Sequence, residues 1–163
     1  MKRIWLLRHA KSSWDDAGLA DHDRPLAPRG RKAAARMARW AADNDVRPDL
    51  VLCSGAVRAR ATLDLVLDGL GRPTVEIDDD LYHASADDLL NRIRVLPAFV
   101  SNVLLVGHNP GLHDLACFLA PPGPETLPTG ALAELRLAVG TWTEARQGCA
   151  RLDVLVVPRS LPR

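Results

Sequence analysis

Cysteine is scarce in this sequence. The three cysteines, Cys53, Cys117 and Cys149, are far apart, and no two of them form a CxxC pair. An odd number of widely spaced cysteines argues against a disulfide framework and against a thiolate zinc site. We therefore expect the protein to work in a reducing compartment, the cytoplasm.

The sequence also lacks long apolar runs and an excess of one charge. The N-terminal apolar run covers only residues 4 to 7, and no stretch approaches the ~18 apolar residues of a membrane span. The formal net charge is +1. A chain so close to neutrality shows no overall electrostatic footprint for nucleic acid or an anionic membrane. We expect neither as a partner, and any anion binding must be local.

Repeats, low-complexity tracts and linkers are absent as well. Proline and glycine fall between periodic segments, and 47% of the residues are hydrophobic. A chain of 163 residues with this composition can bury a substantial core as one unit. The sequence therefore predicts a single domain over residues 1–163.

The hydrophobic periodicity predicts alternating strands and helices. Four segments are typical of buried strands, and two late segments alternate like strands with one wetter face. These strands are expected at 3–7, 49–53, 73–77, 102–107, 131–137 and 151–157. Helices are expected after Pro28, over 86–96 and over 110–119. A further helix is expected to have Ser54 as its N-cap and to turn Val57, Ala61, Leu65 and Val66 inward. This order predicts a three-layer α/β/α sandwich with a mostly parallel sheet.

Charged and polar side chains follow three of the predicted strands. Arg8 and His9 end the first strand, Ser54 and then Arg58 follow the second, and His108 follows the fourth. Ligands of open parallel sheets bind beyond the carboxyl ends of the strands, so these residues are expected to share one crevice. Guanidinium groups and helix N-terminal amides match phosphate oxygens. The sequence therefore predicts a phosphate-binding crevice.

Other conspicuous residues have ordinary interpretations. His22 lies in an acidic loop, and His113 follows His108 at a spacing that does not pair ligands on a helix. Nothing in the sequence has metal-site spacing, so we expect no metal and no cofactor. The basic run "RGRKAAARMAR" places its cations opposite its alanines, which indicates a solvated helix face.

Five ordered motifs resemble those of the histidine phosphatase superfamily, which has the phosphoglycerate mutase-like fold. They are "RHAKSSW" (8–14), "DRPLAPRG" (23–30), "CSGAVRARAT" (53–62), "LYHAS" (81–85) and "LLVGHNPGL" (104–112). The short chain and the "DRPLAPRG" segment are most similar to the SixA-type phosphohistidine phosphatases. Mutases of the superfamily usually carry larger insertions.

The resemblance implies a catalytic set of His9, Arg8, Arg58 and His108. His9 would be the nucleophile, with one ring nitrogen held by a backbone carbonyl, and the other three would bind the phosphoryl oxygens. The nucleophile must be neutral, and nearby guanidinium groups would lower its pKa. His108 would serve best when protonated against a phosphate dianion.

Two residues leave alternatives open. Where many relatives have a glutamate as general acid, this sequence has His83. His83 could donate the proton, no dedicated acid could be needed, or a carboxylate nearby in sequence could act. Arg24 could contact the substrate, or it could pair with Asp21 or Asp23 to shape the loop.

The resemblance implies a metal-independent phosphohydrolase with a covalent phosphohistidine intermediate. The expected partner is a phosphorylated substrate, namely a protein bearing phosphohistidine. The alternatives are a phosphatase of small phosphomonoesters and a non-catalytic phosphate-binding module. The sequence gives no indication of the oligomeric state.

Overall fold

Six strands form one mixed sheet in the order β3-β2-β4-β1-β5-β6. The computed structural model describes all residues, 1–163. The strands β3, β2, β4 and β1 run parallel, and β5 is antiparallel to both of its neighbours, β1 and β6. The strands are β1 (Lys2–Arg8), β2 (Leu50–Cys53), β3 (Thr74–Ile77), β4 (Asn102–Gly107), β5 (Leu132–Leu137) and β6 (Ala150–Val156).

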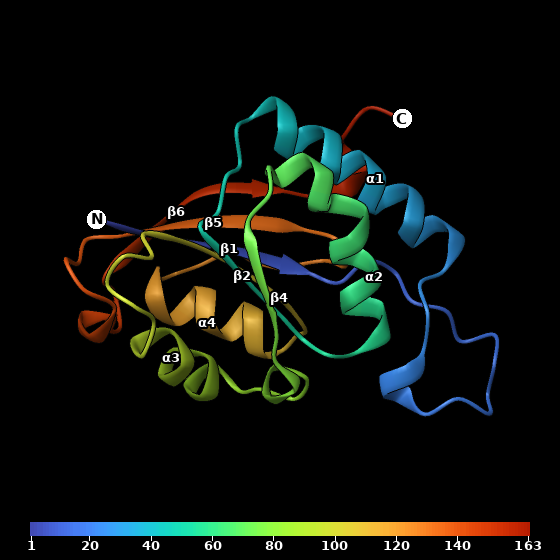
Figure 1. The fold of residues 1–163 in the computed structure, drawn as a ribbon, viewed down its shortest axis with the longest axis horizontal. Coiled ribbons are helices and arrows are strands. Elements are labelled where there is room, and N and C mark those ends of the chain that lie inside the picture. Colours follow the sequence, from blue (N-terminus) through green and yellow to red (C-terminus); the bar gives the residue numbers. More distant parts are fainter.

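Four helices cover the two faces of the sheet. They are α1 (Pro28–Asp43), α2 (Val57–Val66), α3 (Ala86–Arg94) and α4 (Gly111–Leu119). Helices α1 and α2 lie on one side of the sheet, and α3 and α4 lie on the other (Figure 1). The predicted three-layer α/β/α sandwich with a mostly parallel sheet is confirmed. No helix combines the length and the apolar character needed to cross a membrane.

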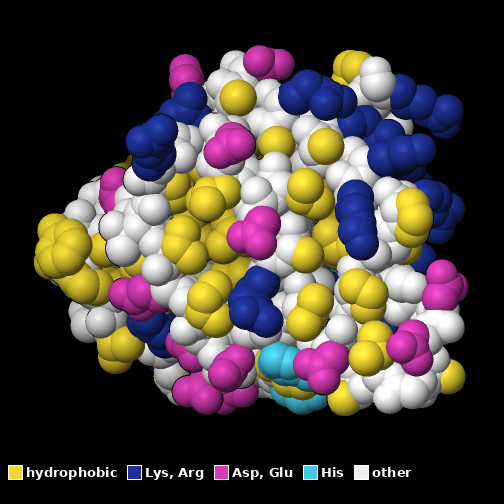
Figure 2. Space-filling model, turned by 45° about the vertical axis from the view of Figure 1, so that its right-hand side comes forward, with side chains coloured by type: hydrophobic (Ala, Val, Ile, Leu, Met, Phe, Trp, Pro, Cys, Tyr) yellow, Lys and Arg dark blue, Asp and Glu magenta, His cyan; other side chains and the backbone are white.

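Helix α1 follows the loop after β1 and packs directly against the start of that loop. Its first residue is Pro28, whose fixed φ suits a first turn. Gly30 is buried, and a Cβ there would lie 2.1 Å from the carbonyl oxygen of Lys11, so only glycine allows this approach. The opposite side of α1 faces solvent, and basic side chains gather along the upper right of the face in Figure 2.

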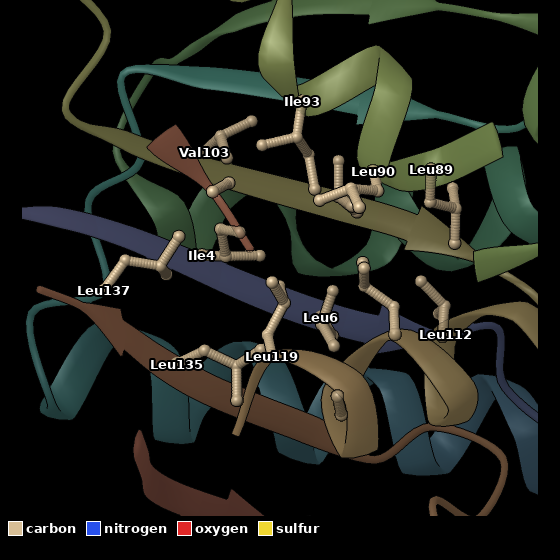
Figure 3. Packing of buried hydrophobic residues seen from close by; sticks show 14 of the residues in the cluster. Ile4, Leu6, Leu89, Leu90, Ile93, Val103, Leu112, Leu119, Leu135 and Leu137 are labelled. Atoms are coloured by element: carbon tan, nitrogen blue, oxygen red, sulfur yellow. The ribbon is translucent and has the colours of Figure 1, made fainter. Parts of the chain in front are cut away.

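Two hydrophobic cores sandwich the sheet. One lies between the sheet and α3 and α4, and Figure 3 shows its side chains from both layers pointing toward one another. Ile4 and Leu6 of β1 contribute to this core, while Trp5 and Leu7 face the second core under α1 and α2. Alternate residues of β1 therefore anchor it on both faces, as expected for a buried parallel strand.

Two expectations about strand burial are wrong. The segment 73–77 was expected to be a buried strand, but all four residues of β3 are exposed because β3 is an edge strand. The segment 131–137 was expected to have a wetter face, but five of the six residues of β5 are buried. The two faces of β5 are covered by the two cores: Ala133 and Leu135 belong to the core under α3 and α4, and Leu132 belongs to the core under α1 and α2.

The expected start of the second helix is also wrong. Helix α2 begins at Val57, three residues after Ser54, and Leu65 is exposed. The buried face of α2 includes Arg58 and Thr62. These two polar residues hide the apolar periodicity on which the expectation depended.

Candidate active site

The end of β1 holds His9 rigidly at the edge of the sheet. The backbone N–H of His9 donates to the carbonyl oxygen of Gly107 on β4 (3.0 Å), and its own carbonyl oxygen accepts from the N–H of Gly130 (3.0 Å). The next residue, Ala10, donates its N–H to Thr62 Oγ1 on α2 (2.9 Å). Three separate elements therefore fix the backbone around His9, whose side chain is buried with 7% of its surface exposed.

The imidazole of His9 is oriented by one hydrogen bond. Its Nδ1 lies 2.8 Å from the carbonyl oxygen of Ala10. A carbonyl can only accept, so Nδ1 carries the proton, and the lone pair of the neutral ring is on Nε2. The pKa of His9 is lowered to about 4: burial is the largest cause, and the positive charges of Arg58, Arg8 and Arg24 add to it, while the Ala10 contact opposes the shift. The ring is therefore neutral at neutral pH.

Two arginines flank this ring. Arg58 lies in the first turn of α2 and is 7% exposed, and Arg8 is the last residue of β1. Arg8 donates to the carbonyl oxygen of Leu127 (3.1 Å). The Nε atoms of both arginines are buried without a hydrogen-bond partner. Both guanidinium groups thus retain donor capacity, which suits binding of an anion.

His108 follows β4 and faces His9, with 5.1 Å between the ring centroids. Its Nε2 lies 2.8 Å from Ser54 Oγ, and that oxygen accepts from the N–H of Ala56 (3.2 Å). Ser54 is fully buried, so its hydroxyl hydrogen needs an acceptor, and His108 Nε2 is the acceptor within reach. The proton of neutral His108 is then on Nδ1, which is buried without a partner.

His108 is neutral in the free protein, whereas the sequence expectation concerned its state against a phosphate dianion. The pKa of His108 is lowered to about 3, with burial as the largest cause, followed by electrostatic repulsion from His9, Arg58 and His83. Asp21 opposes the shift only weakly. A bound phosphate dianion would raise the pKa of His108, because an opposite charge favours the protonated form.

Sequence reasoning offered Asp21 only as a partner of Arg24, and it missed both the contact of Asp21 with Arg58 and the presence of Tyr82 at the site. Asp21 pairs with Arg58 (3.0 Å) and with Arg24 (2.8 Å), and its carboxylate accepts a hydrogen bond from the Tyr82 hydroxyl. These contacts, led by that of Tyr82, hold the pKa of Asp21 well below its usual range. The Tyr82 ring meets His108 edge-on at 5.4 Å. Tyr82 is the only tyrosine of the chain. The sequence could have singled out Tyr82 as a rare residue, but it could not show that Tyr82 lies at the site.

Arg24 takes the loop-shaping contacts that were one of its two interpretations. It donates to the carbonyl oxygen of Ser13 (3.1 Å), to Ser12 Oγ and to Asp21, and it stacks over Trp14. These contacts close the loop between β1 and α1. A substrate contact by Arg24 stays a prediction.

The remaining histidines lie at different distances from this site. His83 is exposed and its ring lies against that of Tyr82, tilted by 42°, with 3.9 Å between the ring centroids. His22 meets the other edge of Tyr82 at 4.8 Å, so it borders the site, which its acidic loop did not suggest. His113 binds the carbonyl oxygen of Pro124 (2.8 Å), away from these rings. No three His, Cys, Asp or Glu side chains are grouped so as to hold a metal ion.

The two buried histidines predict a specific pH dependence of stability. Their pKa values are lower in the folded protein than the usual 6.5, so the unfolded chain binds more protons below pH 6.5. The free energy of unfolding should therefore fall by about 2 kcal/mol for each histidine between pH 7 and pH 5. Urea denaturation of the wild type and of His9→Asn/His108→Asn at both pH values measures this. An equal loss of stability in the two proteins would contradict the buried, neutral state of these rings.

Known proteins with similar sequences and structures bear on this site. The model of the histidine phosphatase superfamily (branch 1) matches residues 4–93. An uncharacterised protein of Mycobacterium tuberculosis is 39% identical over 94% of this chain and all of its own length. The phosphohistidine phosphatase SixA of Escherichia coli is 29% identical over 83% of this chain and 85% of its own.

A solved structure of the protein histidine phosphatase SixA with tungstate has the same fold. It superimposes with a TM-score of 0.83 and 25% identity, covering 97% of this chain and 98% of that one. Both the family-model match and the shared fold agree with the resemblance of the five motifs to those of the superfamily. The chain belongs to the histidine phosphatase superfamily, branch 1.

Proposed function

We propose that the protein is a phosphohydrolase that transfers a phosphoryl group to His9 and then to water, and that its substrate is phosphohistidine in a protein partner. Membership of the histidine phosphatase superfamily supports the phosphatase activity. The likeness to two SixA phosphohistidine phosphatases, one by sequence and one by structure, supports the substrate.

The observation that carries the proposal is the state of His9. Its Nδ1–H is bound to Ala10 O, its Nε2 has the lone pair, and its pKa of about 4 keeps it neutral. Neutral imidazole is a nucleophile, whereas imidazolium is not. Beside it, Arg8 and Arg58 offer guanidinium donors and His108 offers Nδ1–H.

In the first step the Nε2 lone pair of His9 attacks phosphorus. The bond between phosphorus and the substrate's imidazole nitrogen breaks, and that nitrogen keeps the electron pair. The substrate imidazole, protonated beforehand on its other ring nitrogen, leaves as the neutral ring. Charge spreads over the three equatorial phosphoryl oxygens in the transition state. Arg8, Arg58 and the Nδ1–H of His108 stabilise it there, in a site whose donors are fixed before the substrate arrives.

In the second step water attacks the phosphorus of phosphorylated His9. The P–N bond breaks, its electron pair returns to Nε2, and inorganic phosphate leaves with the oxygen and both hydrogens of the water. His9 keeps its Nδ1 proton throughout, so Ala10 O holds one tautomer over the whole cycle. Neither step uses a metal ion.

The substrate class depends on whether any side chain in the site can act as a general acid. An alkoxide leaving group requires a proton in the transition state, whereas an imidazole protonated beforehand does not. Asp21 is engaged by Arg24, Arg58 and Tyr82, and its depressed pKa keeps it ionised, so it is a poor proton donor. His83 is exposed and stands where many relatives have a glutamate. This site suits a phosphoramidate better than an alkyl phosphate.

Covalency is tested by trapping the intermediate. After brief incubation with para-nitrophenyl phosphate and a quench in base, mass spectrometry should find a base-stable, acid-labile phosphate on His9. His9→Ala should lose the label and about 1,000-fold or more of the rate, because the nucleophile is gone. The matched control His113→Ala should keep both. Label on a serine or aspartate, or no turnover at all, would contradict the proposal, and no turnover would favour a phosphate-binding module.

Substrate class is tested by comparing leaving groups. Wild-type kcat/KM should be about 100-fold or more higher for phosphohistidine peptides than for sugar and glycerate phosphates, which is the size of a missing general acid. His83→Ala should leave the phosphohistidine rate within about threefold, since that leaving group needs little help. Higher activity on an alkyl phosphate, lost steeply in His83→Ala, would show a small-molecule phosphatase with His83 as its acid.

A further inference from the structure

Basic side chains line one wall of a groove that the proposed reaction does not use. Arg29, Lys32, Arg36 and Arg39 recur every three or four residues along α1, so they share one face over about 15 Å. The C-terminal segment lies alongside and adds Arg159 and Arg163. Together with Ala35, Pro158 and Leu161 they enclose a groove of about 740 Å³, here called the α1 groove.

The α1 groove has cations without counter-charges. None of its six basic side chains forms an ion pair or donates a hydrogen bond, although Arg24, Arg58, Arg92 and Arg136 elsewhere in the chain are paired. No aspartate or glutamate lines the groove. The Nε atom of Arg36 is buried there without a partner. Like charges held this close repel one another, and an external anion would relieve that repulsion.

The sequence indicated an ordinary solvated face for this part of α1. The structure differs because the short helix at Pro158–Ser160 and the residues after it pack beside α1. This face of α1 therefore forms one side of the α1 groove. Basic side chains are seen together on the upper right of the surface in Figure 2, the side on which α1 and the C-terminus lie in Figure 1. This arrangement concentrates positive charge in a chain whose net charge is only +1.

The α1 groove adjoins a smaller cavity whose lining includes segments next to His9. This cavity of about 270 Å³ shares Arg29, Arg36 and Arg159 with the groove and is also lined by Lys11 and Thr129. Lys11 is two residues after His9, and the residue after Thr129 donates its N–H to the carbonyl oxygen of His9. A typical protein partner covers about 800 Å² of surface, which is wide enough to reach both the site and the groove.

We infer that the α1 groove docks an acidic segment of the phosphorylated protein substrate. The inference rests on the proposed function, because it takes that substrate to be a protein. Four α1 cations spread over about 15 Å match about five residues of an extended acidic segment. The groove offers no aromatic side chain on which a base could stack, which favours a polypeptide over single-stranded nucleic acid.

Two synthetic peptides test the docking. Each has 16 residues with phosphohistidine at position 3, and the last eight residues are all Glu in one and all Gln in the other. At 50 mM salt, wild-type kcat/KM should be about tenfold higher for the Glu peptide, and the ratio should approach 1 at 500 mM salt. Arg39→Glu/Arg159→Glu should lower the ratio below about twofold and leave the Gln peptide unchanged.

A matched control separates docking from net charge. Arg60→Glu/Arg72→Glu changes the net charge equally at exposed positions outside the groove, and it should keep the wild-type ratio. Equal rates for the two peptides in the wild type would overturn the inference. So would a control variant that loses the preference as fully as the groove variant.

A binding measurement separates this inference from the proposed function. Fluorescein-labelled octaglutamate without phosphate should bind the wild type and the control variant, and should bind Arg39→Glu/Arg159→Glu about tenfold more weakly at 50 mM salt. If that pattern holds while neither phosphopeptide is hydrolysed, docking stands and the proposed function fails. If a mixed-sequence oligonucleotide displaces the label at lower concentration than unlabelled octaglutamate does, the groove is a nucleic-acid site and the inference is overturned.

Discussion

The hydrogen bond from His9 Nδ1 to the carbonyl oxygen of Ala10 is the contact on which the proposed chemistry depends. It lies within two consecutive residues, so it can hold only if the backbone at this point is fixed. Strand β1 is paired on both sides, and Gly107, Gly130 and Thr62 fix the residues that follow it. The packing of the two cores therefore fixes the backbone of His9 and Ala10, and this backbone holds the imidazole in place.

The second constraint is the balance of charge around this ring. Arg8, Arg24 and Arg58 lie close enough to lower the pKa of His9, and burial lowers the pKa of both His9 and His108. Neutral histidines reduce the positive charge that the free protein must hold, and Asp21 binds two of the guanidinium groups. Asp21 contacts Arg58, which the proposed reaction assigns to phosphate, so a phosphoryl group entering the site must share or displace that contact.

The active site and the α1 groove differ in the burial and the pairing of their positively charged side chains. In the site, Arg58 is buried and Arg8 is half-buried, and they are partly satisfied by Asp21 and by backbone carbonyls. In the groove, the arginines are mostly exposed and unpaired. Fixed donors suit a transition state whose geometry is defined, whereas exposed, unpaired cations suit a partner whose sequence varies. The two regions thus correspond to reaction and recognition.

Much of the fold could be predicted from sequence because apolar periodicity and strand-end residues are local signals. The alternation of strands and helices, and the position of Arg8, His9 and His108 after strands, follow from such signals. The burial of β3 and β5 could not be predicted, because it depends on where each strand lies in the sheet. The face of α2 was misassigned because Arg58 and Thr62 serve the site from buried positions.

The long-range contacts in the site could not be predicted from the sequence either. Asp21 and Tyr82 are 61 residues apart and meet only through the fold. The protonation of His108 was predicted from the needs of a bound dianion, whereas in the free protein burial and neighbouring cations decide it. Sequence motifs identified which residue types gather at the site, but not the electrostatic state they adopt together.

The tautomer of His9 tests the central claim most directly. Long-range ¹H–¹⁵N correlation spectra of histidine-labelled protein at pH 7, assigned with His9→Asn, report which ring nitrogen carries a proton. The account predicts a neutral ring with the proton on Nδ1 and an unprotonated Nε2. A proton on Nε2, or on both nitrogens, would leave His9 without a lone pair directed at phosphorus and would contradict its role as the nucleophile.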